Sequence, residues 1–333
     1  MRTTITDVAK QAGVSMKTVS RVLNNEPNVA KATRERVMAV AEQLDYSPNL
    51  AARGLASSKS YLIALLYDNA SPSYLTKIQR GAIEACRPHG YHLLLEPMTV
   101  EQANGPDVER LLRRMNADGA ILTPPLCDLP GLRDRLKQLD IRYVTVGPED
   151  ADDAPSVRMD DWDAAFQMAT YLIECGHRDI GFVAGHPDHA SSHFRRAGFE
   201  AALQQAGLDL PEHRVAQGDY GFRSGMEAGS DLLSDTTSRP SAVFASNDDM
   251  AAGVLSVANR LGIAVPESLS VCGFDDTPIA CILWPQLTTV AQPIRQMGRK
   301  AAQTLIQPKE PDTPVTHTFD YELIIRGSTA SPS

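Results

Sequence analysis

From Tyr61 onward, short apolar segments that end in polar turns alternate with amphipathic helical segments. The first are residues 61–69, 118–125 and 141–148, and three later ones end in the turns GHPD, SNDD and GFDD. Alternation of this kind is typical of parallel sheets that carry helices on both faces. The body of the chain is therefore expected to be an α/β structure built from doubly wound parallel sheets.

The alternating pattern divides into two sets near residue 160, and the two sets are similar. The stretch QRGAIEACRPHGY at 79–91 has a counterpart in RRAGFEAALQQAGL at 195–208. Two similar lobes indicate a cleft between them, with a ligand held at the carboxyl ends of the strands.

Residues 1–46 are organised differently, as short helices joined by a tight turn. Thr6 is expected to cap a first helix, Asp7 to Ala12, and Gly13 to end it in a left-handed conformation. Ser15 is expected to cap a second helix that runs to about residue 24. So short a connection makes the two helices cross steeply, which is the helix-turn-helix layout.

The second helix separates apolar from polar side chains. Its inward side carries Val19, Val22 and Leu23. A third helix, which starts at Ala30 without a capping side chain, can close a three-helix core with the stripe Val37, Val40, Ala41 and Leu44. The opposite side of the second helix presents Met16, Lys17, Ser20, Arg21 and Asn24. From the residues alone, this polar side is either a nucleic-acid contact or an ordinary solvated face.

Charge is distributed unevenly along the chain, whose net charge is −9. Residues 1–60 hold nine Lys/Arg and five Asp/Glu and carry +4, whereas the remainder carries −13. A basic head on an acidic body favours contact with a polyanion through the head alone.

Four segments (7–9, 12–15, 18–24 and 33–37) closely resemble the headpiece of the lactose-repressor (LacI/GalR) family of transcription regulators. The resemblance continues through nearly all of the chain. It implies that Met16, Lys17 and Arg21 reach base edges in the major groove of double-stranded DNA. Contacts to phosphates or bases are expected from Thr18, Ser20 and Asn24, and the expected DNA-binding set also includes Thr6 and Ser15.

Residues 47–60 connect the headpiece to the body. From the residues alone a plain linker is the simpler interpretation, because one or two helical turns are marginal in water. The pattern PNLAARGLA (48–56) resembles the family's hinge helix, however. The resemblance implies a helix that orders when two copies meet in the minor groove, with Leu55 as a wedge between base pairs. The expected contacts in this segment are Asn49, Ala52, Arg53 and Leu55.

By the same resemblance, the body looks like a periplasmic sugar-binding protein with two lobes. The first lobe is expected at 61–160, completed by about 291–320, and the second at 161–290, completed by about 321–330. Residue-by-residue match implies effector contacts from the first lobe at Asp68, Asn69, Ser71, Tyr74 and Pro124. From the second lobe it implies His189, Ser191, Arg195, Tyr220, Asn247 and Asp275. Trp284 is a further candidate because its ring can stack on a sugar; from the residues alone, Tyr220 and Trp284 are equally consistent with core or rim positions.

These side chains suit a polyhydroxylated ligand, because carboxylates accept from adjacent hydroxyls, arginine donates as a fork and aromatic rings stack on sugars. The expected effector is a saccharide, and a purine-type ligand is the alternative. Without the resemblance, Arg195 and Asp275 are equally consistent with an inter-strand ion pair. The cluster Asp160-Asp161-x-Asp163 favours a helix N-terminus over a metal site.

Other features exclude several classes of protein. The five widely spaced cysteines are expected to be core thiols in a reducing compartment. No apolar run approaches a membrane span, and the N-terminus lacks a secretory segment, so a cytoplasmic, nucleoid-associated protein is expected. A nucleophile elbow and a phosphate loop are also absent, so we expect neither an enzyme nor a cofactor or metal.

The sequence thus predicts an all-α helix-turn-helix headpiece on a two-lobed, periplasmic-binding-protein-like α/β body. The predicted function is a ligand-responsive transcription regulator, a repressor of carbohydrate-utilisation genes. Tetramers of the family that it resembles use an extra C-terminal Leu-heptad helix, whereas this chain stops at ASPS. The resemblance therefore implies a homodimer on a pseudo-palindromic operator. The alternatives are a cytoplasmic sugar-binding protein and a sugar-active enzyme with an accessory DNA-binding head.

Overall fold

The structure is a computed structural model that describes residues 3–23, 27–46, 59–68, 71–150, 154–307 and 314–332. Its contacts divide the chain into two compact units, Met1–Tyr61 and Leu62–Ser333. The predicted contacts Asn24, Asn49, Ala52, Arg53, Leu55 and Asn69 lie outside the described residues.

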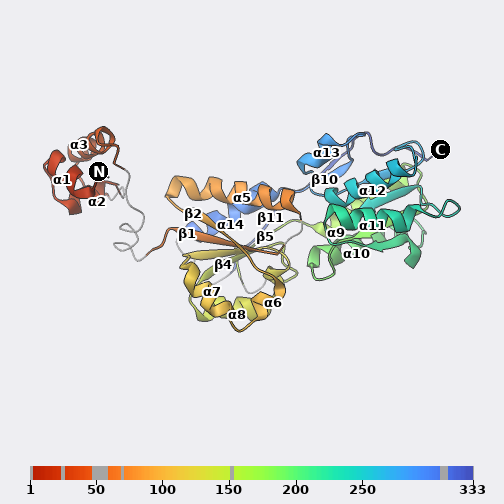
Figure 1. Ribbon diagram of the computed structural model, residues 1–333, viewed down its shortest axis with the longest axis horizontal. Helices are drawn as coiled ribbons and strands as arrows, with labels where there is room; N and C mark the ends of the chain where they lie inside the picture. Colours follow the sequence, from red (N-terminus) through yellow and green to blue (C-terminus); the bar gives the residue numbers. More distant parts are fainter. Residues whose placement is uncertain are drawn as a thin grey trace. The chain divides into compact units, whose positions relative to one another are not determined.

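The first unit contains three helices, α1 (Ile5–Ala12), α2 (Met16–Leu23) and α3 (Lys31–Gln43) (Figure 1). Val8, Val19 and Val37, one from each helix, are fully buried and form the centre of a small apolar core. Gly13 ends α1 with φ of 66°, a left-handed conformation that favours glycine. The predicted helix-turn-helix is confirmed.

The start of α1 differs from the prediction. Thr4, not Thr6, is the N-cap: its side chain accepts from the amide of Asp7, while the Asp7 carboxylate accepts from the Thr4 amide at 2.9 Å. This capping box needs the carboxylate three residues after the cap, a position that Asp7 holds relative to Thr4. Thr6 instead donates to the sulfur of Met16 at 3.4 Å.

The other two helix starts follow the prediction. Ser15 caps α2, since its Oγ accepts from the amide of Thr18 at 3.1 Å. Ala30 stands at the N-cap of α3 and makes no side-chain hydrogen bond there.

The first lobe of the second unit is a six-stranded parallel sheet in the order β11-β5-β4-β3-β1-β2. The strands are β1 (Leu62–Tyr67), β2 (His92–Pro97), β3 (Gly119–Leu122), β4 (Arg142–Val146), β5 (Ser156–Arg158) and β11 (Thr316–Thr318). One face is covered by α5 (Pro72–Cys86) and α14 (Ile294–Ile306) (Figure 1). The other is covered by α6 (Val100–Asn104), α7 (Val108–Met115) and α8 (Pro130–Gln138).

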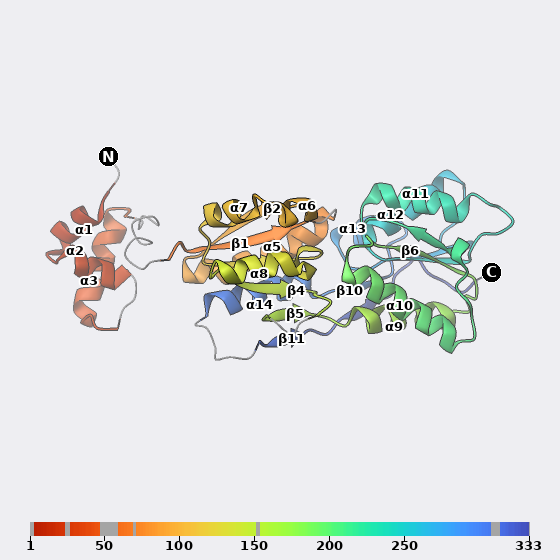
Figure 2. The same cartoon turned by 90° about the horizontal axis from the view of Figure 1, so that it is seen from below.

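The second lobe is a four-stranded parallel sheet in the order β7-β6-β8-β9. Its strands are β6 (Ile180–Ala184), β7 (Val215–Gln217), β8 (Ala242–Ala245) and β9 (Ser270–Cys272). Helices α9 (Asp161–Glu174) and α10 (Ala190–Gln205) pack on one face, and α11 (Phe222–Leu233) and α12 (Asp248–Arg260) on the other (Figure 2). Both lobes have helices on two faces of a parallel sheet, so the predicted fold class is confirmed.

The chain passes between the lobes three times. It leaves the first lobe after β5, returns to it after β10 (Thr289–Ala291) to form α14, and leaves it again after β11. The final strand, β12 (Glu322–Ile324), pairs antiparallel with β10. A short helix, α13 (Pro278–Ile282), follows β9.

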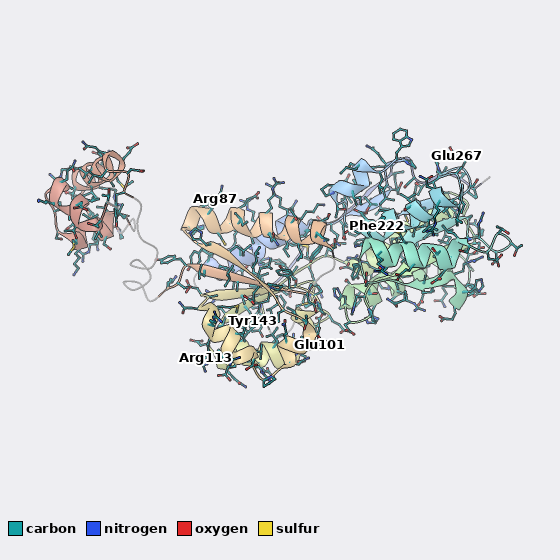
Figure 3. All side chains as sticks on the ribbon, viewed as in Figure 1. Arg87, Glu101, Arg113, Tyr143, Phe222 and Glu267 are labelled. Carbon is teal, nitrogen blue, oxygen red and sulfur yellow. The ribbon has the colours of Figure 1, made fainter. Side chains whose placement is uncertain are left out.

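Charged side chains such as Glu101 and Arg113 point outward, whereas Tyr143 lies inside the first lobe (Figure 3).

The internal repeat places a glycine at a close helix contact in each lobe. A Cβ on Gly81 of α5 would lie 1.9 Å from the carbonyl oxygen of Arg295 in α14. A Cβ on Gly198 of α10 would lie 2.0 Å from the carbonyl oxygen of Trp162 in α9. Only glycine allows either pair of helices to approach this closely.

The cysteines are free thiols. Cys86, Cys127 and Cys272 are buried as expected and Cys175 is half-buried. The prediction is wrong for Cys281, which is exposed because α13 lies at the surface. Within the described ranges, no helix is both long and apolar enough to cross a bilayer.

Candidate functional site

A polar pocket lies between the two lobes, where the carboxyl ends of strands meet the first turns of helices. The second lobe lines it with Asp161, His189, Ser191, Arg195, Tyr220, Asn247 and Asp275. The remaining lining residues are Ser71, Tyr74, Pro124, Gly147, Gln292 and Met297. This is the position at which open α/β folds bind ligands.

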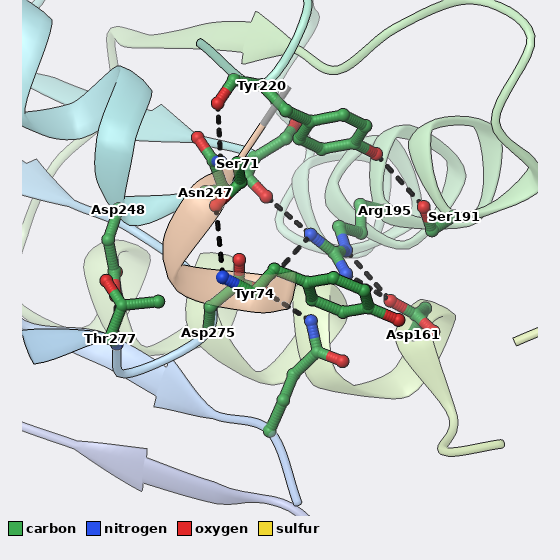
Figure 4. Close-up of polar contacts among 12 residues, drawn as sticks. Ser71, Tyr74, Asp161, Ser191, Arg195, Tyr220, Asn247, Asp248, Asp275 and Thr277 are labelled. Atoms are coloured by element: carbon green, nitrogen blue, oxygen red, sulfur yellow. Dashed lines mark hydrogen bonds and ion pairs between the residues drawn. The ribbon is translucent and has the colours of Figure 1, made fainter. Parts of the chain in front are cut away.

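The guanidinium of Arg195 is the centre of the pocket's polar network (Figure 4). Its Nε and Nη2 each lie 2.8 Å from Oδ1 of Asp161, and Nη1 donates to the carbonyl of Ser246 at 2.5 Å. Nη1 also lies 3.8 Å from Oδ1 of Asp275, and the guanidinium lies 3.7 Å from the ring centroid of Phe274. Burial opposes the charge of Arg195, but Asp161 and the other acidic neighbours hold its pKa above the ordinary value.

The Asp275 carboxylate enters the pocket from the turn after β9. Its Oδ1 accepts from Nε2 of Gln292 at 2.5 Å. Burial raises the pKa of Asp275 to about 7, against the opposing effect of Arg195. Burial likewise raises the pKa of Asp161, and Arg195 again opposes it. The pocket thus holds one guanidinium between two carboxyl groups, which can donate to and accept from ligand hydroxyls.

Tyr220 forms one wall of the pocket. Its hydroxyl and the hydroxyl of Ser191 are 3.0 Å apart, and Nδ2 of Asn247 donates to its carbonyl at 2.9 Å. A Cβ on Gly185 would lie 2.2 Å from Cζ of Tyr220, so the ring occupies space that only a glycine leaves open. The His189 ring is 5.2 Å from the Tyr220 ring. Burial lowers the pKa of His189 to about 3, so this imidazole is neutral at neutral pH.

Ser71 and Tyr74 contribute to the pocket from the start of α5. The Oγ of Ser71 caps α5 by accepting from the amide of Tyr74 at 3.3 Å. It also donates to Oδ2 of Asp249 in the second lobe at 2.7 Å. Burial raises the pKa of Tyr74, so its phenol stays protonated.

A second candidate site is the outer side of α2 in the headpiece. Met16 is 53% exposed, and Lys17 and Arg21 are exposed beside it. Thr18 and Ser20 are half-buried, and the hydroxyls of Ser15 and Thr18 lie 2.9 Å apart. The side chains of Lys17 and Arg21 can therefore reach a partner in solution.

Comparison with known proteins agrees with this arrangement. Residues 4–49 match the family described as bacterial regulatory proteins, lacI family, and residues 169–329 match a periplasmic binding protein-like domain. The HTH-type transcriptional repressor CytR of Escherichia coli (strain K12) is 34% identical over 330 residues, covering 98% of this chain and 96% of the relative. The chain belongs to the LacI family of bacterial regulatory proteins.

Solved structures of LacI-family regulators have the same fold. The lac repressor dimer bound to operator and the anti-inducer ONPF aligns with a TM-score of 0.80 and 25% identity, covering 99% of this chain and 100% of that one. The complex of the transcriptional regulator CelR with cellobiose aligns with a TM-score of 0.74 and 31% identity, covering 98% and 100%. As a LacI-family member the protein is a DNA-binding transcription regulator.

Most of the effector contacts expected from the LacI-family resemblance line one pocket. These are Ser71, Tyr74, Pro124, His189, Ser191, Arg195, Tyr220, Asn247 and Asp275. Asp68 and Trp284 are not among the lining residues. The Asp68 carboxylate instead accepts from the amide of Val100 at 3.2 Å, and the Trp284 side chain is 93% exposed.

Gly147, Asp161, Gln292 and Met297 line the pocket but were not predicted to do so. The acidic cluster is a helix N-terminus as predicted, since Oδ1 of Asp160 accepts from the amide of Asp163 at 2.9 Å. Because the cluster was expected only at a helix N-terminus, the position of Asp161 in the pocket lining was not predicted. Helix α10 begins at Ala190, so the Arg195 side chain projects from inside the helix. Among the described residues, no group of three or more potential ligands could hold a metal ion.

Proposed function

We propose that this LacI-family protein is a repressor whose DNA binding is controlled by a saccharide in the interlobe pocket. The observation that carries the proposal is the placement of Arg195 between the carboxyl groups of Asp161 and Asp275. Such a network recognises vicinal hydroxyls, which donate to carboxylates and accept from a guanidinium. The genes that it represses would be those of carbohydrate utilisation. It would act in the cytoplasm, at the nucleoid.

In the headpiece, Met16, Lys17 and Arg21 would read base edges in the major groove. The exposure of all three supports this role. Arginine can bond bidentately to the O6 and N7 of guanine, whereas lysine offers a single mobile charge. The expected partner is a pseudo-palindromic operator bound by a homodimer. The similarity to a lac repressor dimer on operator supports that assembly.

A saccharide is the effector class that the lining residues favour. Two tyrosines and a neutral histidine supply ring faces, and the polar groups of Asn247, Ser191 and Arg195 supply donors and acceptors. The similarity to a regulator solved with cellobiose supports the same class. A purine-type effector is the second candidate, because the same rings can stack on a base.

Two experiments separate this function from a sugar-binding protein or a sugar-active enzyme. Selection of duplexes from random oligonucleotides with the full chain should yield one palindromic sequence. A thermal-shift screen of the full chain against neutral sugars and nucleobases should then identify the effector. Deleting residues 1–60 should abolish duplex binding and preserve the thermal shift. A chain that selects no sequence, or whose deletion variant still does, contradicts the proposal.

A further inference from the structure

Lys77 of α5 connects the first lobe to the turn of the second lobe that carries Asp275. Its ammonium group donates to the carbonyl oxygen of Asp275 at 2.9 Å and to that of Asp276 at 2.5 Å. Lys77 is half-buried and does not line the pocket. An ammonium group suits this position, because it has three donors and a compact charge that can face two carbonyl oxygens at once.

The turn that Lys77 contacts has an unusual backbone. Asp275 has φ of 108° and Asp276 has φ of 47°, values that favour glycine. Residues other than glycine hold such conformations only where the surroundings fix them. Inside the second lobe, the amide of Asp275 donates to the carbonyl of Val290 at 2.8 Å, and the Asp276 carboxylate accepts from Arg326 at 2.6 Å. The amide of Asp276 also donates to the hydroxyl of Thr289 at 3.4 Å. These bonds hold amides and side chains of the turn, whereas its two carbonyls accept from Lys77.

The next residue of the turn is fixed from within the second lobe. Oδ2 of Asp248 accepts from the amide of Thr277 at 2.6 Å and from its hydroxyl at 3.0 Å. Oδ1 of Asp248 accepts from the hydroxyl of Thr289 at 2.6 Å. The turn is therefore anchored to its own lobe on one side, while its carbonyls reach across to the other lobe.

A second polar contact between the lobes starts from the same helix. Ser71, at the N-cap of α5, donates to Asp249. Asp249 lies two positions after the pocket residue Asn247, and Asp276 lies one position after the pocket residue Asp275. One helix of the first lobe thus holds both loops through which the second lobe presents Asn247 and Asp275.

We propose that Lys77 is a positioning residue of the effector pocket, which couples closure of the two lobes to the backbone conformation that aims the Asp275 carboxylate. When the lobes close, the ammonium group meets the two carbonyls and stabilises the turn. When the lobes separate, the carbonyls lose their donor and the turn relaxes. This role rests on the proposed effector site, but the contact itself can be tested without any effector.

The test measures lobe closure in the full chain with no small molecule added. Spin labels are placed at Arg110→Cys on α7 and Arg223→Cys on α11, both exposed positions, in a background with the exposed Cys281 changed to serine. Labelled protein is diluted with unlabelled protein, and the interlobe distance distribution is measured by pulsed electron resonance. Lys77→Met should increase the share of the longer-distance form about tenfold or more, because a hydrogen bond to a charged group is lost.

Two variants make the result specific. Lys77→Arg keeps a cation and should restore the wild-type distribution. Lys300→Met removes a half-buried lysine of the same lobe, whose amino group has no hydrogen bond or ion pair among the described residues, and should change nothing. A wild-type distribution in Lys77→Met overturns the proposal, as does a failure of Lys77→Arg to restore closure.

Amide hydrogen exchange at Asp276, whose amide has only a long hydrogen bond of 3.4 Å to Thr289, provides a second readout on the same proteins. Lys77→Met should speed exchange of this amide about tenfold, while the amide of Thr277, which Asp248 holds, and the amides of the β6 strand keep their protection. If Lys77→Met does not fold, Lys77→Ala, which also removes the donor, is measured instead. Unchanged exchange in the folded variant overturns the proposal. Because neither readout uses an effector or DNA, failure here is distinct from failure of the proposed function.

Discussion

Asp161 and Arg195 are 34 residues apart in sequence, yet the Asp161 carboxylate lies 2.8 Å from the Arg195 guanidinium in the pocket. Both side chains are almost completely removed from solvent. The pair links the first turn of α9 to the middle of α10. Asp275 approaches the same guanidinium from the turn after β9. Pocket shape and pocket charge therefore depend on the same three residues.

Removing the guanidinium should destabilise the protein strongly. Arg195→Met leaves two carboxyl groups buried without their cation, and breaking a buried pair in this way costs about 3–5 kcal/mol. Urea unfolding at neutral pH measures the loss. The matched control is Arg223→Met on α11, because Arg223 pairs with Glu227 in an exposed position and should cost no more than about 1 kcal/mol. Equal losses in the two variants would show that the buried network does not stabilise the fold.

Stability should depend on the protonation of Asp275. Its pKa is raised to about 7 in the folded chain from an ordinary value of about 3.9. The folded state therefore binds more protons between these values, so this contribution to stability is fully present below about pH 4 and lost as the pH rises to about 7. Asp275→Asn should remove this part of the pH dependence. Free energies of unfolding at pH 5 and pH 7.5 check this prediction. If wild type and Asp275→Asn lose the same free energy of unfolding between these two pH values, the prediction is contradicted.

The capping box predicts which of two neighbouring threonines matters for α1. Thr4→Ala removes the side chain that accepts from the Asp7 amide, and should destabilise the headpiece by about 1 kcal/mol. Thr6→Ala removes only a weak contact to Met16 and should have little effect. Hydrogen exchange of the α1 amides in the full chain measures both. A larger effect of Thr6→Ala would restore the sequence-based assignment of the cap.

Arg21 should determine preference at one base pair of the operator. Arg21→Ala should weaken binding by about 1–3 kcal/mol and relax that preference, because a bidentate contact to guanine is lost. Arg36→Ala, an exposed arginine of α3, is the charge-matched control and should affect all sequences alike. Fluorescence anisotropy with the selected duplex and its single-base variants distinguishes the two. An unchanged base preference in Arg21→Ala would remove Arg21 from the recognition surface.

The sequence predicts the fold well because the relevant signals are local. Apolar strands that end in polar turns predict both sheets, and the polar turns supply Asn247 and Asp275 to the pocket. Gln292 could not be found in this way, because it enters the pocket where the chain crosses back between lobes. Asp161 was missed because an acidic residue in a first helical turn already has a sufficient local explanation.

Two expected effector contacts do not line the pocket, and each case has a physical cause. Trp284 was predicted to stack on a sugar because aromatic residues do so, but α13 and the segment after it lie at the surface, where the indole is exposed. Asp68 follows a strand, as several residues that line the pocket do, yet its carboxylate accepts from the amide of Val100 at the start of α6. Position at a strand end thus indicates proximity to the pocket, and the neighbouring loop decides which way the side chain turns.

The most direct test of the account is the affinity of the full chain for its selected duplex, measured by anisotropy with and without the effector found in the screen. We expect effector to change the dissociation constant by at least about fivefold in wild type. Asp275→Ala should bind the duplex as wild type does without effector and show no change with it. A wild-type affinity that is the same at every effector concentration would contradict the claim that pocket occupancy controls DNA binding.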